Sequence, residues 1–171
     1  MEPVGRRIEH GAATLFARFL TRNVGLPEAV LTPGSPTASE PDAILRIGIE
    51  VTQVHYSDED AHSAFDLMRD VDRGIRRRTE MRGVPAADLT FVERAQMLLD
   101  RKATRDYGVP TYLVLDARLA GLHSADEGPG LVAQLHVPAG AKFEGVFLLL
   151  ARNAAIGPGG VEFFEVTERA R

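Results

Sequence analysis

The run "TYLVLDARL" at residues 111–119 constrains the fold more than any other stretch, because its apolar side chains are nearly continuous. A strand with this pattern is typical of a sheet that is covered on both faces. Apolar stripes with helical spacing occur over 6–21, over 57–82, and in a segment that starts at Asp88 or Thr90 and ends near Tyr107. The sequence therefore predicts a mixed α/β fold with helices layered around one sheet.

A second stretch, "PDAILRIGIEVTQV" at residues 41–54, alternates apolar and polar side chains with the period of a β-strand. It predicts a hairpin in which Gly48 is the left-handed residue that ends the turn. The apolar pattern selects a register in which Asp42 lies opposite Glu50, or opposite Thr52 with Glu50 on the diagonal. At that separation the two carboxylates repel each other unless a cation lies between them or one is protonated.

A hard divalent ion, Mg²⁺ or Mn²⁺, is the partner expected for such a pair of acids. It binds one or two carboxylates and takes its remaining ligands from water and substrate phosphate. We expect Asp42 and Glu50 to bind the ion, with the backbone carbonyl of Val51 completing the shell. The alternative interpretation is a solvated hairpin face, with Asp42 as a turn residue after Pro41.

Length and composition favour one domain over residues 1–171, with 44% apolar residues. We expect a loop over 32–41, where proline, glycine, serine and threonine concentrate. Strands expected over 131–137, 143–151 and 161–167 would extend the same domain across 120–171. The chain has no cysteine, which fits a reducing cytoplasm, and no apolar run long enough to span a membrane.

The net charge of −4 argues against a protein that binds nucleic acid over its whole surface. Lys102 and Lys142 are the only lysines of the chain, so each is of interest. A basic segment could hold phosphate groups of a nucleic acid, or form an ordinary solvated helix face. Its residues are Arg73, Arg76, Arg77 and Arg78.

The residues "PD" at 41–42 and "IEVT" at 49–52 resemble the motif of the PD-(D/E)xK, or restriction-endonuclease-like, nuclease superfamily. The expected order of elements over 6–119 is similar to the core of that family, which is helix, three strands, helix, strand. The resemblance implies a metal-dependent endonuclease that hydrolyses phosphodiester bonds of DNA or, as the second choice, RNA. It also implies that Asp42 and Glu50 are the metal ligands.

Thr52 stands where the family has a lysine that helps to orient the attacking water. Lys102, on the helix before the 111–119 run, is our candidate for its replacement. By the same resemblance, Glu9 corresponds to an acid of the first helix and Gln96 to a polar residue of the later helix.

The loss of the motif lysine leaves another interpretation open, a binding or regulatory module that keeps the nuclease fold without its chemistry. A homodimer or an accessory subunit, with the strands after residue 130 as the partner surface, is a further possibility.

Overall fold

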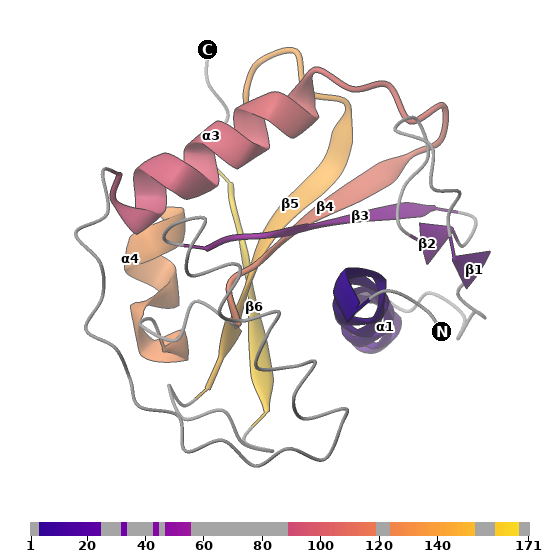
Figure 1. Ribbon diagram of the computed structural model, residues 1–171, viewed down its shortest axis with the longest axis horizontal. Helices are drawn as coiled ribbons and strands as arrows, with labels where there is room; N and C mark the ends of the chain where they lie inside the picture. The colour runs from indigo at the N-terminus through magenta and orange to yellow at the C-terminus, as the bar shows by residue number, and fades with distance from the viewer. Residues whose placement is uncertain are drawn as a thin grey trace.

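The computed structural model describes residues 4–24, 32–33, 43–44, 47–55, 89–118, 124–152 and 160–167. Within them, helix α1 (Val4–Val24) covers one face of a mixed sheet, and helices α3 (Phe91–Ala103) and α4 (Gly128–Val132) lie on the other (Figure 1). The α/β architecture with helices on both sides of the sheet is therefore confirmed. None of the described helices combines the length and the apolarity needed to cross a membrane.

Within the described parts of the chain, the sheet contains six strands, which lie side by side in chain order. Their bounds are β1 (Thr32–Pro33), β2 (Ala43–Ile44), β3 (Gly48–Gln53), β4 (Thr111–Asp116), β5 (Phe143–Ala151) and β6 (Val161–Glu165). β2 is antiparallel to both neighbours, β3 to β5 are mutually parallel, and β6 is antiparallel to β5. The strands β5 and β6 thus continue the sheet beyond β4.

The hairpin of β2 and β3 adopts the first of the two predicted registers. Ala43 pairs with Ile49 and Ile44 with Gly48, so residues 45–47 form the connection. The prediction for Gly48 is wrong, because it belongs to β3 and its N–H donates to the carbonyl of Pro110 at 2.7 Å. Only Gly108 and Gly160 have positive φ angles among the described residues.

Strand β4 contributes to two separate cores, which explains its continuous apolar sequence. Leu113 and Leu115 pack toward α3, whereas Val114 packs toward α1. The α3-side core includes Val54, Phe91, Ala95, Leu99, Leu148 and Leu150, and the α1-side core includes Ala12, Ala13, Phe16, Leu20, Ile49, Val51 and Leu149. The strand is therefore covered on both faces, as its sequence predicts.

Helix α3 begins one residue after Thr90, one of the two predicted starting points. The Thr90 hydroxyl accepts from the Glu93 N–H and the Glu93 carboxylate accepts from the Thr90 N–H, which is a complete capping box. The helix ends at Ala103, earlier than predicted, where Thr104 is the C-cap. The chain from residue 105 to Tyr107 therefore lies beyond the helix.

Two predictions about strands and loops are wrong. Residues 131–137 are not a strand, because Leu131 belongs to α4 and only Val137 forms an isolated bridge. Leu131 and Leu135 are four residues apart and both reach the α3-side core, which is the spacing of a helical turn. In the segment 32–41, expected as loop, Thr32 and Pro33 form the edge strand β1. The helix expected over 57–82 lies outside the described residues.

Candidate functional site

Glu50 is a buried acid in the middle of β3. Its neighbours in the strand, Ile49 and Val51, pack under α1, so the Glu50 side chain faces the opposite side, toward α3. It pairs with Leu113 of β4 and is the first residue of β3 after the described pairing with β2. Its side chain is 3% exposed, so its negative charge requires a partner.

Lys102, in the last turn of α3, is that partner. Its Nζ donates a hydrogen bond to Oε1 of Glu50, and its side chain is 12% exposed. The capping box fixes where α3 begins, and Leu99 is fully buried one turn before Lys102, which orients this end of the helix over β3. The structure therefore places the lysine proposed as a replacement directly on the acid of the motif.

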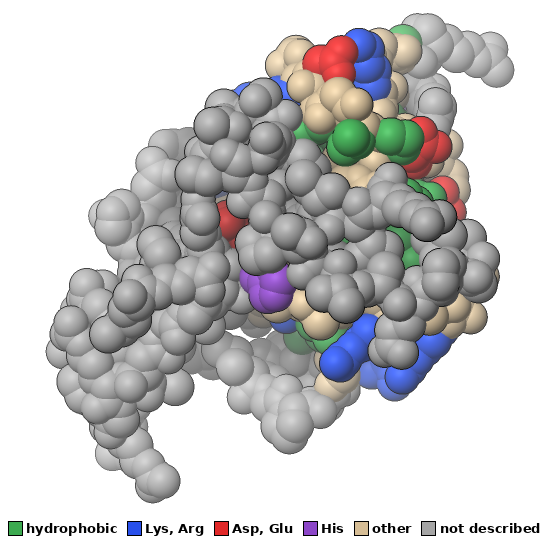
Figure 2. Space-filling view, turned by 90° about the vertical axis from the view of Figure 1, so that its right-hand side faces the viewer, with side chains coloured by type: hydrophobic (Ala, Val, Ile, Leu, Met, Phe, Trp, Pro, Cys, Tyr) green, Lys and Arg blue, Asp and Glu red, His purple; other side chains and the backbone are tan. Residues whose placement is uncertain are grey.

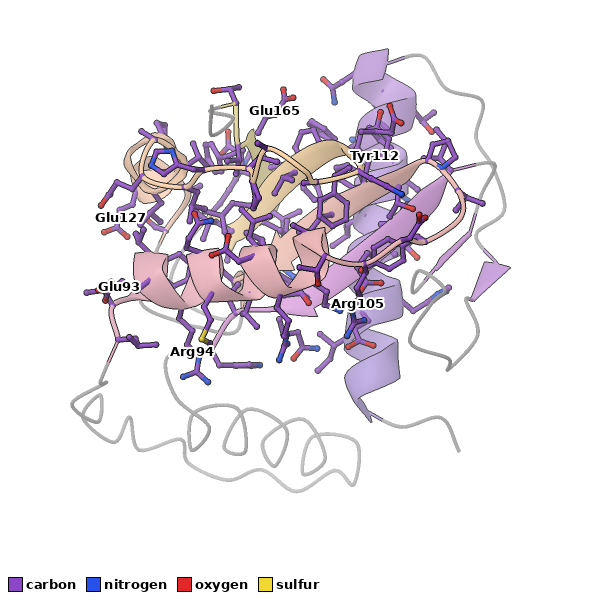
Figure 3. The ribbon with its side chains drawn as sticks, turned by 90° about the horizontal axis from the view of Figure 1, so that it is seen from above. Glu93, Arg94, Arg105, Tyr112, Glu127 and Glu165 are labelled. Atoms are coloured by element: carbon purple, nitrogen blue, oxygen red, sulfur yellow. The ribbon has the colours of Figure 1, made fainter. Side chains whose placement is uncertain are left out.

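Arg105 and Tyr107, which the sequence analysis did not select, extend the site beyond α3. Nη1 of Arg105 lies 4.0 Å from Oε1 of Glu50, and its side chain is 36% exposed. Figure 3 shows Arg105 just beyond the C-terminal end of α3. No periodic pattern marks these residues, because they follow the helix rather than belong to its apolar stripe.

The hydroxyl of Tyr107 is buried at this site. Tyr107 is 8% exposed, and its ring packs near Phe143 with the centroids 6.1 Å apart. Burial raises the Tyr107 pKa, the negative charge of Glu50 raises it further, and Arg105 opposes these effects.

Thr52 lies on the same face of β3 as Glu50 and is also buried. It pairs with Leu115 and is followed on this face by Val54 of the apolar core. The side chain of Val51 is buried on the α1 side, and the metal-ligand role that we predicted for its backbone carbonyl stays a prediction.

Among the described residues, the hydrogen bonds of Gln96 are not made with Glu50, and Glu9 lies on a helix that covers the other face of the sheet. The Gln96 amide donates to the His136 carbonyl and accepts from the His136 N–H, both at 2.9 Å, and so ties α3 to the segment after α4. Glu9 belongs to α1, which covers the face opposite the Glu50 side chain.

Asp42 and the basic segment of Arg73, Arg76, Arg77 and Arg78 lie outside the described residues, so their predicted roles stay predictions. Within the described part of the chain, no three His, Cys, Asp or Glu side chains gather as a metal site. On the side of the molecule shown in Figure 2, the coloured basic side chains stand in separate groups rather than in one stripe.

A second buried ion pair lies at the carboxyl end of β4, on the α1 side by strand alternation. Nε and Nη2 of Arg118 donate to the two carboxylate oxygens of Asp116 at 2.8 and 2.7 Å. Burial lowers the Arg118 pKa, but the hydrogen bonds and charge of Asp116 outweigh it and raise the pKa overall. Because Asp116 uses both oxygens on Arg118, this pair is a structural element rather than an open site.

Comparisons of the chain with family models, with curated proteins and with solved structures find no match.

Proposed function

We propose that this protein is a metal-dependent nuclease of the PD-(D/E)xK type, which hydrolyses phosphodiester bonds of DNA. The observation that carries the proposal is the contact of Lys102 with Glu50, across 52 residues of sequence. In the family motif, a lysine two residues after the glutamate lies next to it. Here Lys102 of α3 lies next to Glu50 instead. The order α1, β1 to β3, α3, β4 also supports the proposal, because it is the order of the family core.

The register of the hairpin gives further support. Ala43 lies opposite Ile49, so the same register continued by one position would set Asp42 opposite Glu50. The β-carbons of directly opposed residues are about 4.5–5.5 Å apart, which suits two carboxylates that share one cation.

Oxygen ligands at such a position fit Mg²⁺ or Mn²⁺. Asp42, Glu50 and the carbonyl of Val51 would hold the ion, which when bound supplies Lewis acidity toward phosphate and a bound water of lowered pKa. Glu50 is suited to this because its carboxylate sits on a rigid, doubly covered strand.

The side chains of the protein have separate tasks in this proposal. Lys102 carries the positive charge that stabilises the negative charge developing on the phosphate oxygens. The hydroxyl of Thr52, two residues after Glu50, would hydrogen-bond the attacking water, which is a weaker version of the task of the motif lysine. Arg73, Arg76, Arg77 and Arg78 would contact backbone phosphates. We propose a cytoplasmic location for this activity.

The direct test is cleavage of supercoiled plasmid, and of single-stranded DNA and RNA, in Mg²⁺ or Mn²⁺. We expect cleavage by the wild type, and losses of at least about a hundredfold in Glu50→Gln and Lys102→Met, as is typical when a group acting on the transition state is removed. Lys142→Met is the matched control, because Lys142 pairs with Asp106 on the surface. Cleavage of the same rate in Glu50→Gln would refute the proposal.

The second candidate is a nuclease fold without nuclease chemistry. The substitution of Thr52 for the motif lysine favours it, since the Glu50–Lys102 contact could then be a purely structural ion pair. Calorimetric titration with Mn²⁺ separates the two functions. Absence of Mn²⁺ binding to the folded wild-type protein would favour the inactive module.

A further inference from the structure

The negative charge of Glu50 is held by cations of this chain at one of its two carboxylate oxygens. Nζ of Lys102 donates to Oε1, and Nη1 of Arg105 lies 4.0 Å from the same atom. The side chains of Glu50 and Lys102 are 3% and 12% exposed, so water screens their two charges poorly. Within the described part of the chain, Glu50 is therefore an acid whose charge a lysine already neutralises.

A divalent cation at Glu50 and the ammonium of Lys102 would compete for the same carboxylate. A cation on either oxygen of Glu50 would lie close to the ammonium, and like charges repel strongly where water is excluded. The ammonium can withdraw, because it is carried on a flexible stem. Helix α3 does not have to move with it, since the Thr90 cap fixes its start and Leu99 is fully buried one turn before Lys102.

We propose that Lys102 is an internal competitor that regulates cation binding at Glu50, because its ammonium leaves Oε1 when a divalent cation binds there and returns when the cation is lost. That a cation binds Glu50 rests on the proposed function, whereas the contact of Lys102 with Glu50 does not. Lys102 then becomes available to a phosphate oxygen only after the cation has bound. Arg105 is a weaker competitor, since its guanidinium lies 4.0 Å from Oε1 and its side chain is 36% exposed.

The competition has a sign that distinguishes Lys102 from a supporting residue of a metal site. By linkage, the factor by which Lys102 weakens cation binding equals the factor by which the cation weakens the contact of Lys102 with Glu50. Such couplings are typically about 5- to 150-fold. Removal of Lys102 should therefore raise the cation affinity although it lowers the rate of cleavage, whereas removal of a residue that merely holds the site together would lower both.

Calorimetric titration with Mn²⁺ at constant ionic strength measures this sign. We expect Lys102→Met to bind Mn²⁺ about tenfold more tightly than the wild type, and Lys102→Arg to bind it as the wild type does because the positive charge is kept. Lys142→Met is the matched control, since it removes the same charge from the exposed pair with Asp106 and should leave the affinity unchanged. Glu50→Gln should bind Mn²⁺ least.

The wild-type protein offers a second measurement, which stays decisive if Lys102→Met fails to fold. The chain has only two lysines, so lysine labelled with ¹³C at Cε gives one NMR signal for Lys102 and one for Lys142. During a titration with Mg²⁺, the Lys102 signal should shift along the same saturation curve as cation binding, and the Lys142 signal should stay in place. In Glu50→Gln, Mg²⁺ should leave both signals unchanged.

The results separate this inference from the nuclease proposal. Equal Mn²⁺ affinity of the wild type and Lys102→Met, or a Lys102 signal that stays in place while Mg²⁺ binds, would overturn the competition and leave the cation site standing. Absence of cation binding to both the wild type and Lys102→Met would remove the cation site and the competition with it. Tighter binding to Lys102→Met, in a protein that cleaves no nucleic acid with any metal, would keep the competition and remove the nuclease.

Discussion

Replacing Lys102 by methionine should destabilise the protein strongly, although it changes a residue at the end of a helix. The substitution keeps the length of the side chain and removes its charge, so Glu50 loses the ammonium that it contacts. Breaking a buried ion pair by removing one partner costs about 3–5 kcal/mol, because the other charge stays buried. Arg105 remains 4.0 Å away and is partly exposed, so it offsets part of the loss. We expect a loss of about 3 kcal/mol in the free energy of unfolding, the low end of that range.

Urea denaturation at pH 7 in EDTA measures this loss, and Lys142→Met provides the contrast. Lys142 also pairs with an acid, but its side chain is 70% exposed and that of Asp106 is 65% exposed. An exposed pair contributes about 0–1 kcal/mol. Because the chain has only these two lysines, the two variants compare a buried pair and an exposed pair in one protein.

A double-mutant cycle with Glu50→Gln isolates the pair. In the Glu50→Gln background, Lys102→Met should cost less by about 2 kcal/mol than in the wild type, since no buried negative charge remains. Mn²⁺ should restore stability to Lys102→Met more than to the wild type, because the ion can take the place of the lost ammonium. A Lys102→Met protein as stable as Lys142→Met, or additive effects in the cycle, would refute the role of the buried pair.

Three further predictions concern the cap of α3, the buried hydroxyl and the second ion pair. Thr90→Ala should lower the free energy of unfolding by about 1 kcal/mol in urea titrations. Since the hydrogen bonds from Thr90 lower the Glu93 pKa, the contribution of Glu93 is present above its ordinary pKa and lost as the pH falls, so the Thr90→Ala deficit should shrink in acid. Because the Tyr107 pKa is raised, the folded protein keeps a proton that the unfolded chain releases above the ordinary pKa of 10.0. The free energy of unfolding of the wild type should therefore fall more steeply above this pH than that of Tyr107→Phe. Parallel pH profiles in chemical denaturation would contradict this. Asp116→Asn should cost about 2–3 kcal/mol in urea, because the partly buried Arg118 loses its charged partner, and an unchanged urea midpoint would show the pair to be dispensable.

Local alternation and amphipathic stripes predicted much of the fold. The period of two in residues 41–54 narrowed the hairpin to two registers, one of which is observed, and the continuous apolar run of β4 predicted helices on both faces. Residues 131–137 were misassigned because a short helix followed by a turn brings Leu131 and Leu135 to the core without a long periodic segment. Short elements carry too little pattern for their type to be recognised.

The site was predictable where strand alternation or a rare residue type marked a residue. Lys102 stood out because lysine occurs twice in the chain, and the structure joins it to Glu50. Arg105 and Tyr107 were missed because their position depends on where α3 ends, which the Thr104 cap decides. The Gln96 amide is used by the backbone of His136, a contact between distant segments that periodicity does not report.

The parallel pairing of β3 with β4 has a consequence for synthesis on the ribosome. Parallel neighbours require a crossover connection, and Lys102 lies on the crossover between β3 and β4, so it can reach Glu50 only after the chain through α3 has emerged. A nascent chain that carries β3 alone holds an unaccompanied acid and no lysine. The Glu50–Lys102 pair therefore forms in a long-range folding step, which is slow in such topologies. A truncated chain that ends before α3 should lack this ion pair.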